Sequence, residues 1–316
     1  MKQLAVITPI SHLPGVSELI KTKGETFFLE KGNKEEVRKL LITKPIDIIF
    51  CNPNHQNYKI DKELLEGTNV SVVSTASTGL NHIDLDYCRD NNIVVQSHKN
   101  DFKLINQLPS TSELAFGLML DLLRNITHSQ TPVSNYEWDY TKFMGRQIKD
   151  LKIGIVGYGR LGKMMAKYCK AFGAKFKVFD PYVKSELSDP FLLNHYSLSL
   201  EELFQFSDVV SLHVHVTDET KYMINKDLLG LSKKDLYIIN TSRGEIVNEI
   251  DIVEGLTTGT LTGYGTDVIE NEFDDLTESP IIKAMNQGKN IITTPHVGGM
   301  TIEGQTKAYK WAINKL

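Results

Sequence analysis

Short apolar runs alternate with polar, helix-compatible segments along the first hundred residues. The runs with strand character span residues 4–10, 26–29, 47–51, 70–74 and 93–96. Polar segments such as 33–41 and 61–65 lie between them. Strands that alternate with helices are typical of a parallel sheet covered on both faces. This part of the chain therefore predicts an α/β domain.

The same alternation restarts at residue 151 and is cleaner there. The predicted strands span 152–156, 175–179, 208–214, 236–240, 263–268 and 290–294. Six strands with intervening helices match a dinucleotide-binding sheet. A last helix follows to Leu316 and is expected to return to the first domain. We predict two doubly wound α/β domains: a flavodoxin-like substrate domain of residues 1–100 and 298–316, and a Rossmann cofactor domain of residues 101–297.

One long apolar-rich segment lies between the two alternating regions. Ser110 and Glu113 have the spacing of a capping box, with Ser110 as the N-cap and Glu113 as the third helical residue. We expect a helix from there to about Arg124. Its apolar residues occupy more than one face, and such a helix is usually buried on several sides. It is a reasonable bridge between the domains.

Composition places the chain among soluble globular proteins. Its 316 residues allow roughly two domains. Hydrophobic residues at 41% and charged residues at 23% exclude a disordered chain, a collagen-like chain and a coiled coil. A net charge of -4 without a basic run gives no support for a nucleic-acid or anionic-membrane partner. The strongest apolar stretch, 114–123, is too short to span a membrane.

Cysteine and histidine usage excludes other classes of site. The N-terminus is interpreted as a first strand and not as a secretion signal. Three widely spaced cysteines without a CxxC pair indicate buried free thiols, and hence a cytoplasmic protein. His213 and His215 share one face of a predicted strand, which is a metal-ligand spacing. No acidic residue or cysteine nearby completes a ligand set, so no metal is predicted.

A GxGxxG pattern of Gly157, Gly159 and Gly162 follows an apolar strand and opens a helix. The first glycine permits a tight turn, the second lets a pyrophosphate approach, and the third lets helix and strand pack closely. The N–H groups at the helix start can hold the phosphates. Asp180 ends the next strand and could bind the ribose hydroxyls and repel a 2′-phosphate, with Lys184 as the only nearby cation. This predicts NAD over NADP, unless Asp180 serves only a turn.

The chain resembles the D-2-hydroxyacid dehydrogenases, the superfamily that includes phosphoglycerate dehydrogenase, over nearly its whole length. The resemblance rests on four ordered motifs at 151–162, 240–244, 267–272 and 294–299. It implies NAD-dependent interconversion of a 2-hydroxy acid and a 2-oxo acid. It also implies that Arg243 binds the substrate, and that Glu272 and His296 are the acid/base pair.

The resemblance also implies the binding residues. Asp267 looks like the residue that receives the nicotinamide carboxamide. Residues 75–84 match the loop whose N–H groups hold the substrate carboxylate, carried by Ser77, Thr78 and Gly79. Arg243 and His296 are the other implied substrate contacts. The remaining implied cofactor contacts are Gly157, Gly159, Arg160, Leu161, Gly162, Asp180, Val214, Thr217, Thr241 and Gly298.

Elementary chemistry agrees with these roles. A 2-oxo acid needs a cation for its carboxylate, and arginine offers a bidentate fork. Its carbonyl oxygen needs a proton donor, and a histidine beside a carboxylate suits that task. Arg243, Glu272 and His296 follow three successive predicted strands, and open α/β sheets bind ligands at such ends. Taken singly, Arg243 could pair with a surface acid and His296 could be a plain loop residue.

Several positions depart from the family pattern. Phe273 follows Glu272 where the family usually has proline, and Glu270 is a rival for the catalytic role. Asn52 and Thr75 stand where phosphoglycerate enzymes usually supply arginine. Asn52, Asn54 and His55 offer neutral hydrogen-bonding groups, which favour a polar, uncharged substrate side chain. A protonated His55, or Lys59, could still reach a phosphate.

Four further expectations concern the class of protein and its assembly. The alternative to an enzyme is a non-catalytic NAD-binding protein that senses redox state, as some relatives of this family do. Oxidation of formate is disfavoured because formate enzymes usually carry glutamine at the Glu272 position. We expect a homodimer built through the cofactor domain around residues 111–124, and no regulatory domain after the final helix.

Overall fold

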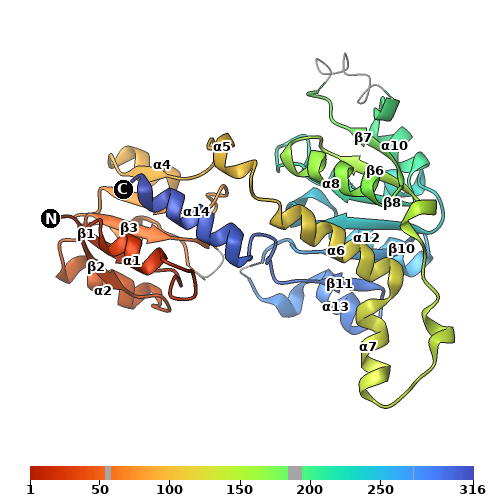
Figure 1. Ribbon diagram of the computed structural model, residues 1–316, viewed down its shortest axis with the longest axis horizontal. Coiled ribbons are helices and arrows are strands. Elements are labelled where there is room, and N and C mark those ends of the chain that lie inside the picture. The colour runs from red at the N-terminus through yellow and green to blue at the C-terminus, as the bar shows by residue number, and fades with distance from the viewer. Residues whose placement is uncertain (54–57, 184–193, 273) are drawn as a thin grey trace. The chain divides into compact units, whose positions relative to one another are not determined.

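The computed structural model describes residues 1–53, 58–183, 194–272 and 274–316 (Figure 1). The chain forms two compact units. The first unit comprises Met1–Leu108 and Gly299–Leu316, and the second comprises Pro109–Gly298. No helix in the described ranges is both long enough and apolar enough to cross a membrane.

The first unit contains a five-stranded sheet in the order β2-β1-β3-β4-β5, with every pair parallel. This 2-1-3-4-5 order is that of flavodoxin-like folds, which confirms the predicted architecture. The strands are β1 (Gln3–Val6), β2 (Glu25–Phe28), β3 (Ile48–Cys51), β4 (Val72–Thr75) and β5 (Val94–Gln96). The helices are α1 (Val16–Lys21), α2 (Lys34–Thr43), α3 (Lys62–Leu65), α4 (Leu85–Asp90), α5 (Phe102–Ile105) and α14 (Ile302–Asn314).

Both faces of this sheet are covered, because its strands are apolar at successive positions. Leu4 and Val6 face a core that α1 and α14 complete. Ala5 and Ile7 face the opposite core, which α2 and α3 cover. The last helix of the chain, α14, therefore belongs to the core of the first unit, and the first unit is discontinuous in sequence.

The second unit contains a six-stranded parallel sheet in the order β11-β10-β9-β8-β6-β7. A parallel bridge between Val178 and Tyr196 extends it beyond β7. With that bridge the order follows the Rossmann pattern, whose switch point lies between β6 and β8. The strands are β6 (Lys152–Val156), β7 (Lys175–Phe179), β8 (Val209–Leu212), β9 (Leu236–Asn240), β10 (Leu261–Thr266) and β11 (Ile291–Thr293).

Helices cover both faces of the second sheet as well. The two helices α6 and α8 pack against residues such as Ile153 and Ile155 of β6. Helices α10 to α13 pack on the opposite face, against residues such as Val210 and Leu212 of β8. The helices are α6 (Ser110–Arg124), α7 (Ile126–Ser134), α8 (Arg160–Ala171), α10 (Leu200–Phe206), α11 (Lys226–Gly230), α12 (Glu249–Thr258) and α13 (Pro280–Asn286). The described part of this unit also contains the short 3-10 helices η2 (Tyr140–Phe143), η3 (Ile148–Asp150), η5 (Gly244–Ile246) and η6 (Leu276–Glu278).

The start of α6 differs from the predicted capping box. Pro109 is the N-cap, and its carbonyl accepts the N–H groups of Ser112 and Glu113. Ser110 is therefore the first residue inside the helix and not its cap. The helix ends at Arg124, as expected.

The division between the units also lies later than predicted, after Leu108 and not after residue 100. The physical reason is packing. Leu104 is buried, and Leu108 packs against the core that α1 and α14 share. The second crossing falls between Gly298 and Gly299, one residue after the predicted point.

Candidate active site

Arg243 lies in a tightly bonded loop after β9. The side chain of Asn240 accepts the N–H of Ser242 at 3.0 Å and donates to the carbonyl of Arg243 at 2.8 Å. The Ser242 hydroxyl donates to the carbonyl of Leu212, at the end of β8, at 2.8 Å. The loop is thus fixed to the carboxyl ends of two neighbouring strands.

The guanidinium of Arg243 is half-buried and donates through Nη1 to the carbonyl of Ser242 at 2.7 Å. Within the described ranges, no carboxylate forms an ion pair with it, so pairing with a surface acid does not explain this arginine. A planar guanidinium has five N–H donors. Donors beyond the one to Ser242 can therefore serve a ligand carboxylate.

Gly244 explains how the Arg243 loop meets the next one. A Cβ atom at Gly244 would lie 2.1 Å from the backbone nitrogen of Glu270, so only glycine fits. The backbones of the two loops are in direct contact for this reason. The loop that carries Arg243 and the loop that leads to Glu272 are consequently held together.

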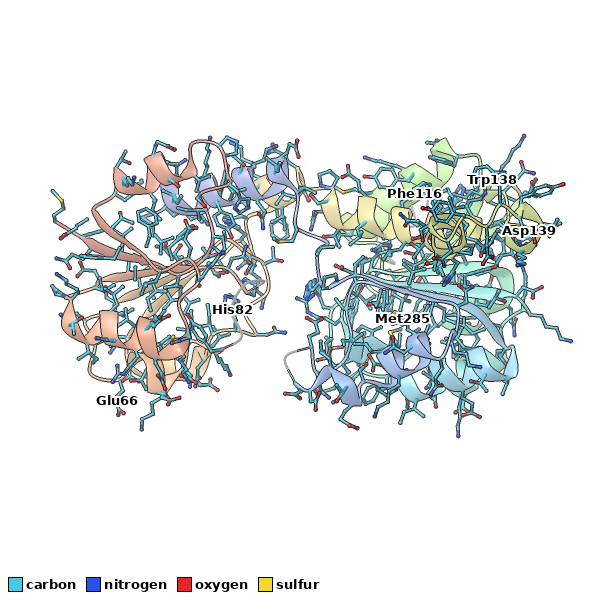
Figure 2. The ribbon with its side chains drawn as sticks, turned by 90° about the horizontal axis from the view of Figure 1, so that it is seen from below. Glu66, His82, Phe116, Trp138, Asp139 and Met285 are labelled. Carbon is cyan, nitrogen blue, oxygen red and sulfur yellow. The ribbon has the colours of Figure 1, made fainter. Side chains whose placement is uncertain are left out.

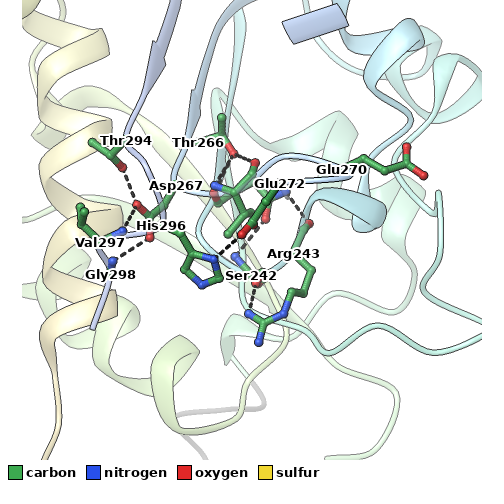
Figure 3. A network of polar contacts seen from close by, with 12 residues as sticks. Ser242, Arg243, Thr266, Asp267, Glu270, Glu272, Thr294, His296, Val297 and Gly298 are labelled. Atoms are coloured by element: carbon green, nitrogen blue, oxygen red, sulfur yellow. Dashed lines mark hydrogen bonds and ion pairs between the residues drawn. The ribbon is translucent and has the colours of Figure 1, made fainter. Parts of the chain in front are cut away.

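Asp267 anchors the loop that follows β11 (Figure 3). Its Oδ1 accepts the Thr294 hydroxyl at 2.5 Å and the Val297 N–H at 2.8 Å, and its Oδ2 accepts the Gly298 N–H at 2.7 Å. Burial raises the pKa of this carboxyl, and the three donors oppose that rise. A Cβ at Gly298 would lie 2.9 Å from Asp267 Oδ2, so a larger residue there would displace the carboxylate.

His296 is held by this anchored loop in a strained conformation. Its φ is +53°, in the left-handed region that costs a non-glycine residue about 1 kcal/mol or more. Its N–H donates to the carbonyls of Asp267 and Thr294, both at 2.9 Å. Its ring nitrogen Nδ1 lies 2.6 Å from Oε2 of Glu272. The geometry therefore brings the two residues of the implied acid/base pair together.

The rival carboxylate, Glu270, points away from His296 (Figure 3). It accepts a hydrogen bond from the hydroxyl of Tyr222, and this bond raises the pKa of Tyr222 to about 12. The N–H of Glu270 donates to the buried carboxyl of Glu249 at 2.8 Å. Glu270 is thus occupied elsewhere, and the geometry favours Glu272 as the partner of His296.

The glycine loop has the shape that a dinucleotide requires. Gly157 has φ +89°, and a Cβ there would lie 2.5 Å from the carbonyl oxygen of His213. A Cβ at Gly162 would lie 2.0 Å from the carbonyl oxygen of Gly157. Beside Gly159, by contrast, no described atom lies within 4 Å of such a Cβ. The protein itself requires the first and third glycines, and the open flank at the second fits an approaching pyrophosphate.

The start of α8 and the end of β7 complete this region. The N-cap of α8, Gly159, makes no side-chain capping bond, and the N–H groups of Leu161 and Gly162 in the first turn can meet phosphate oxygens. The carbonyl of Leu161 accepts the Ser112 hydroxyl at 3.0 Å, which ties α8 to α6. Asp180 Oδ2 accepts the Tyr158 N–H at 2.8 Å, so the carboxylate stands beside the glycine loop. These residues fit the NAD that the sequence implied.

The other implied cofactor residues lie at strand ends of the same unit. Arg160 is the first residue of α8, and burial lowers the pKa of its guanidinium. Val214 and Thr217 follow β8, and Thr241 follows β9. The Thr241 hydroxyl is buried and has no partner among the described residues. A buried hydroxyl without a partner is uncommon and fits a ligand contact.

The implied substrate loop follows β4 in the first unit. Ser77 accepts the N–H of His98 on its carbonyl at 2.9 Å. The N–H groups of Ser77, Thr78 and Gly79 make no hydrogen bond to any described residue. Three successive donors of this kind can bind an anion such as a carboxylate.

Asn52 also takes part in the packing of the first unit. It is buried, and its amide donates to the Tyr309 hydroxyl at 2.7 Å, which ties the end of β3 to α14. This bond gives Asn52 a structural role. Asn54, His55, Lys184 and Phe273 lie outside the described residues.

Sequence reasoning missed three supports of the site. Asn240 and Ser242 belong to the 240–244 motif, and their signal was local, because asparagine and serine at the end of a strand are typical turn-forming residues. The close approach at Gly244 had a signal too, because glycine follows the arginine immediately. The pairing of Tyr222 with Glu270 had no signal, since 48 residues separate them.

Known proteins resemble this chain closely enough to place it. Residues 116–298 match the family described as D-isomer specific 2-hydroxyacid dehydrogenase, NAD binding domain. The chain is 30% identical to the hydroxypyruvate reductase of Thermotoga maritima over 288 residues, which cover 91% of this chain and 88% of that protein. It is 31% identical to the glyoxylate reductase of Thermococcus litoralis over 255 residues, with 78% of this chain and 73% of that protein covered.

A longer relative and a solved structure agree. The chain is 31% identical to the D-3-phosphoglycerate dehydrogenase of Bacillus subtilis, covering 75% of this chain but only 43% of that protein. The D-lactate dehydrogenase of Aquifex aeolicus, solved with NAD and lactic acid, superposes with a TM-score of 0.74 at 27% identity, covering 99% of this chain and 94% of that one. The chain belongs to the NAD-dependent D-isomer specific 2-hydroxyacid dehydrogenases, and its second unit contains their NAD-binding domain.

Proposed function

We propose that this protein interconverts a 2-hydroxy acid and a 2-oxo acid, with NAD as the hydride carrier. The observation that carries the proposal is the contact of His296 Nδ1 with Glu272 at 2.6 Å. It lies in the same unit as the glycine loop and as Arg243, which has no carboxylate partner among the described side chains. A purely NAD-binding module would need neither feature.

When bound, NADH supplies the hydride that reduces the carbonyl carbon. His296 supplies the proton. Glu272 holds Nδ1 of His296 and stabilises the imidazolium, which leaves Nε2 to deliver a proton to the carbonyl oxygen. In the oxidation direction Nε2 takes the proton back from the hydroxyl. Arg243 binds the substrate carboxylate and stabilises negative charge as it develops on the oxygen.

We also assign binding of the substrate carboxylate to the N–H groups of Ser77, Thr78 and Gly79, which donate to no described residue. Asp267 is assigned to the nicotinamide carboxamide, and Asp180 to the adenosine ribose. These assignments rest on the family resemblance. The bonds that hold each residue support them, because a positioned group loses less entropy when its ligand binds.

We propose a homodimer, but through a different surface from the one the sequence suggested. Most apolar residues of α6, including Phe116, Met119 and Leu122, are buried within one subunit. The segment after α6 instead exposes several large apolar side chains, among them Trp138, which is 86% exposed and is labelled in Figure 2. Large exposed apolar patches mark interaction surfaces. The exposed residues are Ile126, Val133, Tyr136, Trp138, Tyr140 and Met144.

Light scattering tests this assembly. The wild-type protein should be a dimer at micromolar concentration, and a Trp138→Ser, Tyr140→Ser variant should be a monomer. A monomeric wild-type protein would contradict the dimer. We also expect a cytoplasmic location, because the three free cysteines are buried thiols.

The function is tested by a screen of 2-oxo acids, in which the oxidation of NADH is measured by its absorbance. The panel contains pyruvate, hydroxypyruvate, glyoxylate and sugar-derived 2-oxo acids. We expect turnover with at least one of them and loss of that turnover in Arg243→Ala. NADH binding without turnover of any acid would instead support the redox-sensing alternative.

A further inference from the structure

Four side-chain and backbone groups form a chain of hydrogen bonds at the end of β4. His82 Nε2 lies 3.2 Å from the hydroxyl of Thr75. The Thr75 hydroxyl lies 3.1 Å from that of Ser77, which donates to the carbonyl of Gly79 at 2.7 Å. Figure 2 labels His82 at an end of the sheet in the first unit. The chain therefore ends within the loop that presents the N–H groups of residues 77–79.

The direction of every bond in this chain follows from its last member. A carbonyl only accepts, so the Ser77 proton is used on Gly79. The contact between the two hydroxyls must then be donated by Thr75. Since Thr75 has spent its single proton, His82 must donate from Nε2. The His82 ring therefore carries its proton on Nε2. Its buried Nδ1 has no hydrogen-bond partner among the described residues.

The groups in the chain are uncharged. Thr75 is fully buried and His82 is 6% exposed. Burial lowers the pKa of His82 to about 4, so the ring is neutral around pH 7. The Cys51 thiol lies 3.8 Å from Nε2, and burial raises its pKa to about 12. The direction of the chain consequently stays the same across the neutral pH range.

The hydrogen bonds of the loop occupy two of its carbonyls and leave three of its N–H groups unused by described residues. The hydroxyl of Ser77 is used on Gly79, and its carbonyl accepts the His98 N–H at 2.9 Å. The carbonyls of Ser77 and Gly79 thus both accept hydrogen bonds from residues of the first unit. What remains are the N–H groups of residues 77–79, which no described residue uses.

We propose that His82 and Thr75 are positioning residues, whose hydrogen bonds hold the loop of residues 77–79 in the form that binds the substrate carboxylate. This proposal rests on the proposed function, which assigns the carboxylate to that loop. Neither residue touches the reacting atoms. Their effect should fall on substrate binding, because a loop already in its bound form loses less freedom when the ligand arrives.

The first test compares Thr75→Val with Thr75→Ser. Valine has the shape of threonine without the hydroxyl, and serine keeps the hydroxyl. For Thr75→Val we expect KM for the 2-oxo acid and Ki for oxamate to rise about fivefold or more. We expect kcat and the Kd of NADH to stay within about twofold of wild type. Thr75→Ser should restore the wild-type KM. Equal KM and Ki values in all three proteins would overturn the proposal.

The second test compares His82→Gln with His82→Met. Glutamine can place its amide N–H where Nε2 lies, and methionine has the same length without a donor. We expect His82→Gln to bind oxamate like wild type and His82→Met to bind it about fivefold more weakly. The opposite ranking would overturn the assigned direction of the chain. The two His82 variants also test the proposal if Thr75→Val fails to fold.

Amide hydrogen exchange separates this proposal from the proposed function. Two protected amides beside the loop are followed by mass spectrometry without substrate: that of Ala76, which donates to the Cys51 carbonyl, and that of His98, which donates to the Ser77 carbonyl. They should exchange faster in Thr75→Val than in wild type and Thr75→Ser, whether or not any 2-oxo acid is turned over. Unchanged exchange would overturn the positioning role. Lack of turnover in the wild type alone would overturn only the proposed function.

Discussion

Glu272 Oε2 lies 2.6 Å from Nδ1 of His296, although 24 residues separate them in the chain. The strands β10 and β11 explain the contact. They are adjacent and parallel, with Thr266 paired to Thr293, so the loops that follow them start side by side. Asp267 then fixes the second loop through its bonds to Thr294, Val297 and Gly298.

Replacing His296 should affect chemistry more than binding. We expect His296→Ala to lower kcat for reduction by about a hundredfold to ten-thousandfold, which is the usual contribution of a positioned general acid. The Kd of NADH, measured by fluorescence, should stay near the wild-type value. A variant that keeps its kcat would contradict the assignment of His296 as the proton donor.

The two glutamates of this loop form a matched pair for a second experiment. Reduction needs the protonated imidazole, and Glu272 is its anionic partner. In Glu272→Gln the imidazolium loses this anionic partner, so kcat for reduction at pH 7 should drop. Glu270→Gln should leave kcat unchanged, because Glu270 bonds Tyr222. An unchanged kcat in Glu272→Gln would contradict the pairing role.

Much of this fold could be predicted because its signals are local. The strands β6, β7 and β9 have the predicted bounds. Each has a clear boundary residue in the sequence: Gly157 directly follows β6, Gly173 lies shortly before β7, and Asn240 ends β9. The alternation of strand and helix likewise predicted the six strands of the second sheet. The Glu272 and His296 contact was expected only through the family resemblance.

The parts that failed depend on tertiary contacts. Ser110 has the sequence of an N-cap, but Pro109 starts the helix one residue earlier. The bond of Asn52 to Tyr309 could not be foreseen, because 257 residues separate the two in the chain. The hydrogen bonds from His82 through Thr75 to the loop had no signal in the sequence, because only the folded loop brings the two side chains together.

The carboxylate of Asp180 should decide the choice of cofactor. It stands beside the glycine loop and would repel a 2′-phosphate. In Asp180→Asn, which keeps an acceptor oxygen for one of the Tyr158 and Tyr182 N–H groups, the preference for NADH over NADPH should fall about tenfold or more. The measurement is kcat/KM with each cofactor. A wild-type enzyme that prefers NADPH would contradict the prediction outright.

A phosphorylated substrate should be poor. Desolvating a phosphate without cationic partners costs several kcal/mol, and Asn52 and Thr75 are uncharged and already bonded. We expect kcat/KM for hydroxypyruvate to exceed that for 3-phosphohydroxypyruvate by about tenfold or more. Pyruvate serves as the control for the hydroxyl group. A tenfold preference for the phosphorylated acid would show that cations outside these positions bind it.

Glu249 should make the stability of the protein depend on pH. It is 4% exposed and accepts the N–H of Glu270 at 2.8 Å. Burial, with added repulsion from Glu270 and Glu245, raises its pKa from 4.5 to about 7. Between these values the folded protein keeps a proton that the unfolded chain has released. Stability should therefore fall as pH rises from 4.5 to 7, by up to about 3 kcal/mol.

The variant Glu249→Gln isolates this effect, because glutamine is neutral at every pH and keeps a carbonyl oxygen for the Glu270 N–H. Urea unfolding at pH 5 and pH 8 measures the free energy of unfolding. The variant should match wild type at pH 5 and exceed it at pH 8, where the wild-type carboxylate is buried with its charge. Glu254→Gln, at an exposed position of the same helix, is the control and should show no such change. If Glu249→Gln differs from wild type equally at both pH values, the buried carboxyl does not titrate in this range.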